Sequence, residues 1–96
     1  MASAHSVGDI GSGHDACGSR ELGTASDNVF INGKGAARIG DSYAPHGCIE
    51  HPPHVGHLAS GSATVYINGR RAGRVGDAID CGGSAAQGSP NVFIGD

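Results

Sequence analysis

Histidine and cysteine are the residues of this sequence with the clearest capacity for chemistry. Six histidines accompany three cysteines, Cys17, Cys48 and Cys81, in a chain of 96 residues. An odd number of cysteines fits a closed disulfide framework poorly, although one disulfide between Cys17 and Cys48 is compatible with the sequence. Mixed imidazole and thiolate donors in a short chain are typical of a zinc site. We therefore expect a bound metal, and we interpret Cys17 and Cys48 as small buried thiols.

Three of these residues share one phase in the sequence. His14, His46 and Cys81 each follow, by a few positions, a Gly-Asp dipeptide. Taken alone, each histidine fits an exposed loop residue as well as it fits a ligand. The shared phase favours a ligand, because repeats that pack around one axis would bring distant loops together at a closed tetrahedral site.

The fourth ligand is expected from the loop between the first and second strand pairs, which contains four histidines. We choose His54, because it lies between Pro-Pro and Val-Gly, a stiff approach and a flexible exit that would direct its ring towards His46. His51 is the alternative, and His57 leads into the next strand. Zinc bound by four protein ligands is structural, whereas catalytic zinc keeps an open position. The predicted metal ligands are His14, His46, His54 and Cys81.

A zinc-dependent hydrolase that uses the His-rich middle loop is the alternative function. It would require an open coordination position and a nearby general acid or base, for which Glu50 and Asp15 are the only adjacent loop carboxylates. No Ser-His-Asp arrangement and no paired carboxylates stand out. We therefore expect no enzyme activity. Iron and nickel also accept imidazole ligands, so zinc is our choice of metal rather than a requirement of the pattern.

The elements that must position these residues are copies of one repeat. A first block occurs three times, as SDNVFING at 26–33, SATVYING at 62–69 and SPNVFIG at 89–95. A second block occurs as AARIGD at 36–41 and AGRVGD at 72–77, and its ending occurs as VGD at 7–9. The chain therefore begins and ends in the middle of a repeat.

These blocks predict β-hairpins. Val-Phe-Ile and Val-Tyr-Ile are strand-forming runs, and two of the three are followed by Asn-Gly, the residue pair typical of a type I′ turn. The Gly-Asp dipeptides are interpreted as turns, in which glycine allows positive φ and aspartate caps the turn. No segment carries a helical period of useful length. We expect strand pairs at 28–33 with 36–40 and at 64–68 with 72–76, and a lone strand at 91–94.

Hairpins this short cannot each bury a face alone, so they should pack around a shared axis as a pyramid. The segments between them, 9–25, 41–61 and 77–88, would then gather at one end. Apolar side chains would be shared between the core and the opposite end, in a division that the pattern leaves open: Val29, Ile31, Val65, Ile67, Val92 and Ile94. His5 is interpreted as a residue of the N-terminal tail.

Composition limits what such a chain can be. A length of 96 residues allows one domain, here residues 1–96, and 18 glycines with only 4% aromatic residues leave little material for a core, so a staple such as a metal is expected. A net charge of −3 and a pI of about 6.0 argue against a nucleic-acid partner. The sequence has no apolar run that could span a bilayer and no secretory signal at its N-terminus. We therefore expect synthesis in a reducing cytoplasm.

Together, the repeated blocks resemble the PAAR-repeat family, over essentially the whole chain. The residues that carry the resemblance are Gly88-Ser-Pro-Asn-Val-Phe-Ile, Ile31-Asn-Gly-Lys34, Ala36-Ala-Arg38 and Val75-Gly-Asp77. The tetrapeptide that names the family is altered, because Gly35-Ala-Ala-Arg38 and Arg71-Ala-Gly-Arg74 stand in its two places. The arginine is kept in both.

The resemblance implies an all-β cone with zinc near its apex, whose broad base binds the blunt end of a trimeric β-helical spike, one tip per trimer. Such tips belong to type VI secretion systems and contractile phage tails, where they help to pierce the target envelope, touch the target membrane transiently and can carry effector proteins. The implied location is the bacterial cytoplasm, followed by delivery with the spike, or the tail tip of a phage virion. The chain ends at Asp96 without an extension, as expected of a bare tip.

Overall fold

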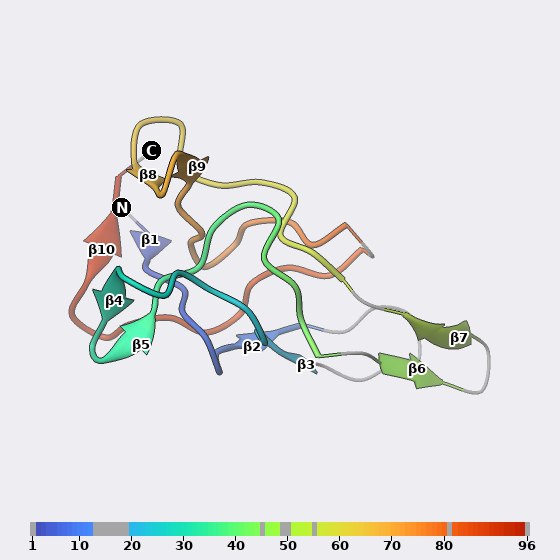
Figure 1. The fold of residues 1–96 in the computed structure, drawn as a ribbon. Coiled ribbons are helices and arrows are strands. Elements are labelled where there is room, and N and C mark those ends of the chain that lie inside the picture. The colour runs from blue at the N-terminus through green and yellow to red at the C-terminus, as the bar shows by residue number, and fades with distance from the viewer. Residues whose placement is uncertain are drawn as a thin grey trace.

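The computed structural model describes residues 2–12, 20–44, 56–80 and 82–95 in full, and the backbone of residues 46–48 and 51–54. These residues form ten short β-strands and no helix, which confirms the predicted all-β class. Three strand pairs surround the broad end of a cone-like molecule, and β6 and β7 lie at its narrow end (Figure 1). The strands are β1 (Ala2–Ser3), β2 (Ile10–Gly11), β3 (Arg20–Glu21), β4 (Phe30–Ile31), β5 (Lys34–Gly35), β6 (His46–Cys48), β7 (His51–His54), β8 (Tyr66–Ile67), β9 (Arg70–Arg71) and β10 (Phe93–Ile94).

Two hairpins form where Asn-Gly predicts them. β4 pairs antiparallel with β5, and β8 pairs antiparallel with β9. Both turns have the left-handed backbone of a type I′ turn, which asparagine and glycine adopt most easily. Each hairpin has only two residue pairs, so the predicted second strands at 36–40 and 72–76 are wrong. The turn residues with positive φ are Asn32 (52°), Gly33 (79°), Asn68 (54°) and Gly69 (76°).

The predicted lone strand at 91–94 has a partner. β10 pairs antiparallel with β1, so that Ala2 lies opposite Ile94 and Ser3 lies opposite Phe93. The N-terminal strand thus takes the place that β5 and β9 hold in the other repeats, although Ala-Ser carries no strand signal. The third unit is therefore completed by the two ends of the chain, and three equivalent strand pairs surround the broad end.

The residues that follow each short hairpin bond to the other repeats around a pseudo-threefold axis. The backbone N–H of His5 donates to Gly73 O (3.1 Å), that of Gly73 donates to Ala37 O (2.8 Å), and that of Ala37 donates to His5 O (3.0 Å). This closed ring explains why the hairpins are short, because the second block pairs between repeats and not within one. The ring is flanked by antiparallel bridges between Ala4 and Arg74, Ser6 and Ala36, and Arg38 and Ala72.

Side chains fasten the three repeats in matching ways. As predicted, the Gly-Asp pairs at 8–9, 40–41 and 76–77 each form a turn in which glycine has positive φ (+89°, +89° and +96°), and in which the aspartate Oδ2 accepts a backbone N–H three residues earlier. These bonds join Ser6 to Asp9 (3.0 Å), Arg38 to Asp41 (2.8 Å) and Arg74 to Asp77 (2.7 Å). The first serine of each first block also donates to a neighbouring repeat. Ser26 and Ser89 donate to turn asparagines, Asn68 and Asn32, and Ser62 donates to Gly95 O just after β10.

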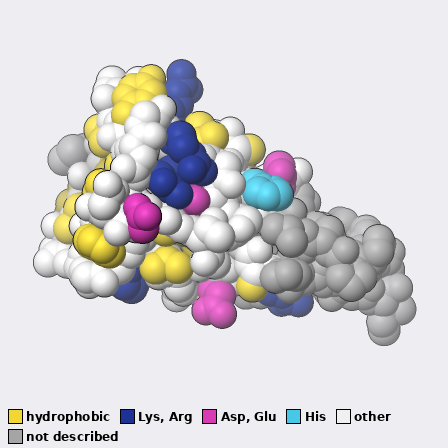
Figure 2. Space-filling view, in the orientation of Figure 1, with side chains coloured by type: hydrophobic (Ala, Val, Ile, Leu, Met, Phe, Trp, Pro, Cys, Tyr) yellow, Lys and Arg dark blue, Asp and Glu magenta, His cyan; other side chains and the backbone are white. Residues whose placement is uncertain are grey.

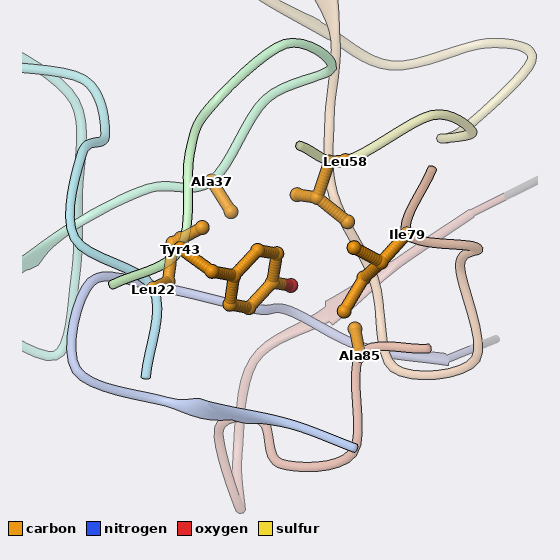
Figure 3. Packing of buried hydrophobic residues seen from close by; sticks show 6 residues of the cluster. All are labelled: Leu22, Ala37, Tyr43, Leu58, Ile79 and Ala85. Carbon is orange, nitrogen blue, oxygen red and sulfur yellow. The ribbon is translucent and has the colours of Figure 1, made fainter. Parts of the chain in front are cut away.

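Two small apolar clusters lie on either side of the axial ring. The base-side cluster is formed by Ala4, Ala36, Ile67, Ala72 and Ile94. The loop-side cluster, in which the Tyr43 ring lies between side chains from all three loops, is formed by Leu22, Ala37, Tyr43, Leu58, Ile79 and Ala85 (Figure 3). The loop stems are joined by bridges of Leu22 to Tyr43, Ser42 to His57, Leu58 to Ile79 and Gly11 to Ala85. In the described residues, the three loops therefore gather at one end as predicted.

Each repeat also has one close backbone approach that requires a glycine. A Cβ on Gly35 would lie 3.1 Å from the Cβ of Ala25 and 2.5 Å from a backbone oxygen. In the other two repeats the glycine stands on the opposite segment, where a Cβ would meet a Cβ across the gap: Gly61 faces Arg71 at 3.1 Å and Gly88 faces Ser3 at 2.7 Å. One partner of each pair is therefore a glycine, which stands on one side of the gap in the first case and on the opposite side in the other two.

The swapped position of the glycine predicts that a second substitution restores stability lost by the first. Gly35→Ser alone should lower the free energy of unfolding by about 1–3 kcal/mol, because its Cβ presses on Ser26 O and on the Cβ of Ala25. Ala25→Gly combined with Gly35→Ser should recover part of that loss, because it removes the second of these contacts. Urea unfolding of the two single variants and the double variant measures the coupling between the sites. Strictly additive losses would contradict the interpretation.

Candidate functional site

Two of the four predicted metal ligands lie on the hairpin at the narrow end. β6 pairs antiparallel with β7, and His46 lies directly opposite His54 in their register. The register is irregular between His46 and Cys48. The other two predicted ligands, His14 and Cys81, lie outside the described residues.

The described residues next to these positions are bonded to one another. Ser12 lies two residues before His14. Its backbone N–H donates to Ser84 O (2.7 Å), and its hydroxyl accepts the N–H of Ser84 (2.9 Å). Tyr43 donates its backbone N–H to Gly56 O (2.8 Å), which joins the two ends of the middle loop. The segments that lead to the predicted ligands therefore converge in the narrow half of the molecule.

His57 and Asp80 connect two more of these segments. The N–H of His57 donates to Asp80 Oδ1 (2.9 Å), the N–H of Asp80 donates to His57 O (2.9 Å), and His57 Nδ1 lies 3.3 Å from Asp80 Oδ2. A carboxylate in this position orients an imidazole and leaves its other nitrogen available, as in the outer shell of metal sites. Among the side chains that the structure describes, no three His, Cys, Asp or Glu residues gather as a metal site. The side chains of all four predicted ligands fall outside those described, so the ligand set stays a prediction.

The arginine kept in both copies of the altered tetrapeptide has a structural role. Each arginine forms an ion pair with the aspartate that ends its block, namely Arg38 with Asp41 (2.9 Å) and Arg74 with Asp77 (2.9 Å). The hydrogen bond to Asp41 raises the pKa of Arg38. In the first repeat Ser6 stands where the arginine would be, and Lys34 supplies the positive charge instead, with its Nζ 3.2 Å from Asp9 Oδ1.

The interpretation of His5 as a tail residue is wrong. Its side chain is fully buried, its Nδ1 lies 2.6 Å from Gln87 O and its Nε2 lies 2.8 Å from the hydroxyl of Tyr43. Burial lowers the pKa of His5 below its usual value of 6.5. The sequence held a signal for this, because counting back from the VGD ending places His5 in register with Ala37 and Gly73, which the fold puts on the axis.

Three aromatic side chains stand exposed at the broad end, in the same position of each repeat. Phe30 on β4 is 58% exposed, Tyr66 on β8 is 55% exposed and Phe93 on β10 is 50% exposed. The isoleucines that follow the last two, Ile67 and Ile94, are only 7% exposed and pack into the base-side cluster. Hydrophobic side chains are seen over this end in Figure 2. We call the three exposed aromatic residues the basal aromatic ring.

Comparison with known families agrees with this architecture. The chain matches the PAAR motif family over residues 4–87, which is most of its length, and it therefore belongs to that family. None of the curated proteins matches the chain at a significant level. In the part of the chain that the structure describes, no helix has the length and apolar character needed to cross a membrane.

The burial pattern at the base predicts opposite outcomes for two neighbouring residues. Tyr66→Ala should change the free energy of unfolding by less than about 1 kcal/mol, because its ring is exposed. Ile67→Ala should lower it by about 2–4 kcal/mol, because it removes buried methyl groups from the base-side cluster. Urea denaturation of the two variants checks this. Equal losses would mean that the ring of Tyr66 supports the fold.

Proposed function

We propose that this protein is the metal-stabilised tip that caps the trimeric β-helical spike of a contractile injection machine and helps it to pierce the target envelope. The machine is a type VI secretion system or a contractile phage tail. Membership of the PAAR family supports this role, since the family is one of structural spike tips. The observation that carries the proposal to this chain is the basal aromatic ring.

The basal aromatic ring suits a partner with threefold symmetry. A monomer can engage three identical subunits at once only if it presents three similar surfaces, related by the same rotation. Here the three aromatic positions are held by equivalent strand pairs and equivalent serine and aspartate turns. Large exposed aromatic side chains are also the residues that most often dominate binding energy at protein interfaces. One tip would therefore cap one trimer.

The opposite end would hold the metal. In this proposal zinc is bound by His14, His46, His54 and Cys81, a set whose chemistry fits a closed structural site. Two observations support the fit: His46 lies opposite His54 in the β6–β7 register, and the stems of the three loops are bonded to one another. When bound, the metal would tie loops from different repeats together and raise the cost of local opening at the apex.

The remaining parts of the role follow from the same assignment. Synthesis would take place in the bacterial cytoplasm, and delivery would occur with the spike or in a phage virion. Effector proteins would travel with the tip as cargo, and its contact with the target membrane would be transient. No nucleic acid is involved, and the metal serves structure rather than catalysis.

The basal aromatic ring should determine the affinity for the spike. Alanine at Phe30, Tyr66 or Phe93 should each weaken binding to the trimeric blunt end of a candidate spike by at least about tenfold, and the triple variant should abolish it. Isothermal titration calorimetry gives the affinity and the stoichiometry of one tip per trimer. Glu21→Ala, an exposed change on β3 away from the base, is the control and should bind normally. Undiminished binding by the folded triple variant would contradict the proposal.

The four predicted ligands should determine the zinc content and the thermal stability. His14→Ala, His46→Ala, His54→Ala and Cys81→Ser should each remove most of the bound zinc and lower the melting temperature by about 10–20 °C, equivalent to ~2–3 kcal/mol in a chain of this size. Elemental analysis and calorimetry make the measurement. His51→Ala should keep its zinc, and loss of zinc in His51→Ala but not in His54→Ala would make His51 the fourth ligand. Full zinc content in one variant removes that residue from the set. An exchangeable water on cobalt-substituted protein would instead indicate an open position and favour the zinc hydrolase.

A further inference from the structure

His5 breaks the pseudo-threefold symmetry at the axis itself. The equivalent positions hold Ala37 and Gly73, so only His5 extends a long side chain from the axial ring into the loop-side cluster. Its ring is fully buried and lies against the ring of Tyr43, with centroids 5.8 Å apart. Both of its ring nitrogens are within hydrogen-bond distance of a partner, Gln87 on one side and Tyr43 on the other.

These two partners belong to different loop stems. Tyr43 stands in the stem that leads to β6, where its backbone N–H is bonded to Gly56 O. Gln87 ends the last loop and is bonded to the first, because its side-chain oxygen accepts the N–H of Ile10 (3.0 Å) and its own N–H donates to Ile10 O (3.2 Å). The ring of His5 therefore bonds directly to two loop stems and, through Gln87, is linked to the third.

The hydrogen bonds define the tautomer of the neutral ring. A carbonyl oxygen only accepts, so Nδ1 carries the hydrogen that is donated to Gln87 O, and Nε2 accepts the hydrogen of the Tyr43 hydroxyl. A second proton on Nε2 makes both nitrogens donors and reverses the bond to Tyr43, so that the ring donates to the hydroxyl oxygen and the hydroxyl hydrogen must turn away from the ring. A positive charge would then also lie in a buried layer next to apolar side chains, which is unfavourable.

The groups around the ring offset only part of the cost of burying a charged imidazole. The hydrogen bond to Gln87 O favours the charged form, as do Asp9 and Asp77, whereas Lys34 opposes it. Asp9 Oδ2 lies 4.0 Å from Nδ1, beyond a hydrogen bond, and its carboxylate already accepts bonds from Ser6 and Lys34. Burial is the largest influence and lowers the pKa of His5.

We propose that His5 is an acid-sensitive latch, which holds the three loop stems together when neutral and releases them when it is protonated, while the strand pairs at the base stay closed. The direction of the pH dependence follows from the linkage between protonation and opening. Because the ring takes up a proton more readily in the open state than in the closed state, its stabilising contribution is complete above pH 6.5 and declines as the pH falls below that value. For one proton, the equilibrium constant for opening rises by up to about tenfold per pH unit.

Amide hydrogen exchange followed by NMR tests the latch. The stem amides are those of Tyr43 and Ala86, and the base amides are those of Ala36 and Ala72, all of which are bonded to backbone oxygens. The ratio of stem to base exchange cancels the intrinsic pH dependence of the chemistry. In the wild type this ratio should rise as the pH falls below 6.5, by at most about tenfold per unit. A flat ratio would overturn the proposal.

Three variants separate the latch from general loosening. His5→Ala introduces the residue that the second repeat already carries at Ala37, and it should flatten the pH dependence of the ratio. Tyr43→Phe should raise stem exchange already at pH 7.5, whereas Tyr66→Phe, a matched change at the base, should not. A wild-type slope in His5→Ala would overturn the proposal.

Acid also competes with any metal held by imidazoles, so both sets of measurements are made on zinc-loaded and on chelator-treated protein. The difference between wild type and His5→Ala should persist in both. If His5→Ala does not fold, the ring nitrogens of His5 are followed in the wild type by ¹⁵N chemical shifts. These should show the Nδ1–H tautomer at pH 7.5 and protonation in step with stem exchange. Protonation of His5 without faster stem exchange would overturn the latch.

Discussion

The rest of the structure depends on three backbone hydrogen bonds that join His5, Ala37 and Gly73 in a ring. Each bond is donated by one repeat and accepted by another, and all three residues are buried. A buried N–H or C=O without a partner is costly, so no repeat can leave the ring without stranding a donor in one neighbour and an acceptor in the other. The ring therefore makes the three repeats one cooperative unit, although each has only a few residue pairs of its own.

The ring also explains the composition. Three chain segments that meet at one axis leave room only for small residues, and a Cβ on Gly73 would lie 2.8 Å from a methyl of Leu58 and 3.0 Å from the Cβ of Ala37. The scarcity of aromatic residues is thus a consequence of close backbone approach. The apolar clusters on either side of the ring are small, and the repeated serine and aspartate turns supply much of the remaining order. Of the described aromatic residues, only Tyr43 is buried; the others lie at the base.

The sequence allowed the repeat, the all-β class, the two type I′ turns and the gathering of the loops to be predicted, because each of these depends on local residue preferences or on counting. It did not allow the pairing partners to be predicted. A segment such as Ala36-Ala-Arg38 can pair equally well within its own repeat or with another repeat. Only closure around the axis selects the pairing between repeats. The partner of β10 was missed for a similar reason. Ala2 and Ser3 have no strand preference of their own, and they are extended because they pair with Ile94 and Phe93.

The same reasoning applies to the candidate site. Counting from the Gly-Asp turns relates positions in different repeats, so it could propose that distant loops converge, and the bonded stems agree with that convergence. It could not place His5, because a histidine near a chain end looks the same whether it is solvated or axial. Nor could periodicity separate Phe30, Tyr66 and Phe93 from the isoleucines beside them, since neighbouring strand residues face opposite sides and both are apolar here.

The two ends of the molecule use the repeat in different ways, and this difference is consistent with the proposed roles. At the base, the three units stay equivalent down to the aromatic position, which is what a symmetric trimer would require of a single-chain partner. At the loop end, a closed tetrahedral metal site needs four donors, while three repeats offer only three equivalent positions. One loop must therefore contribute twice, and the β6–β7 hairpin of the middle loop has the register to do so. Symmetry is kept where a trimer would bind and broken where four ligands would be needed.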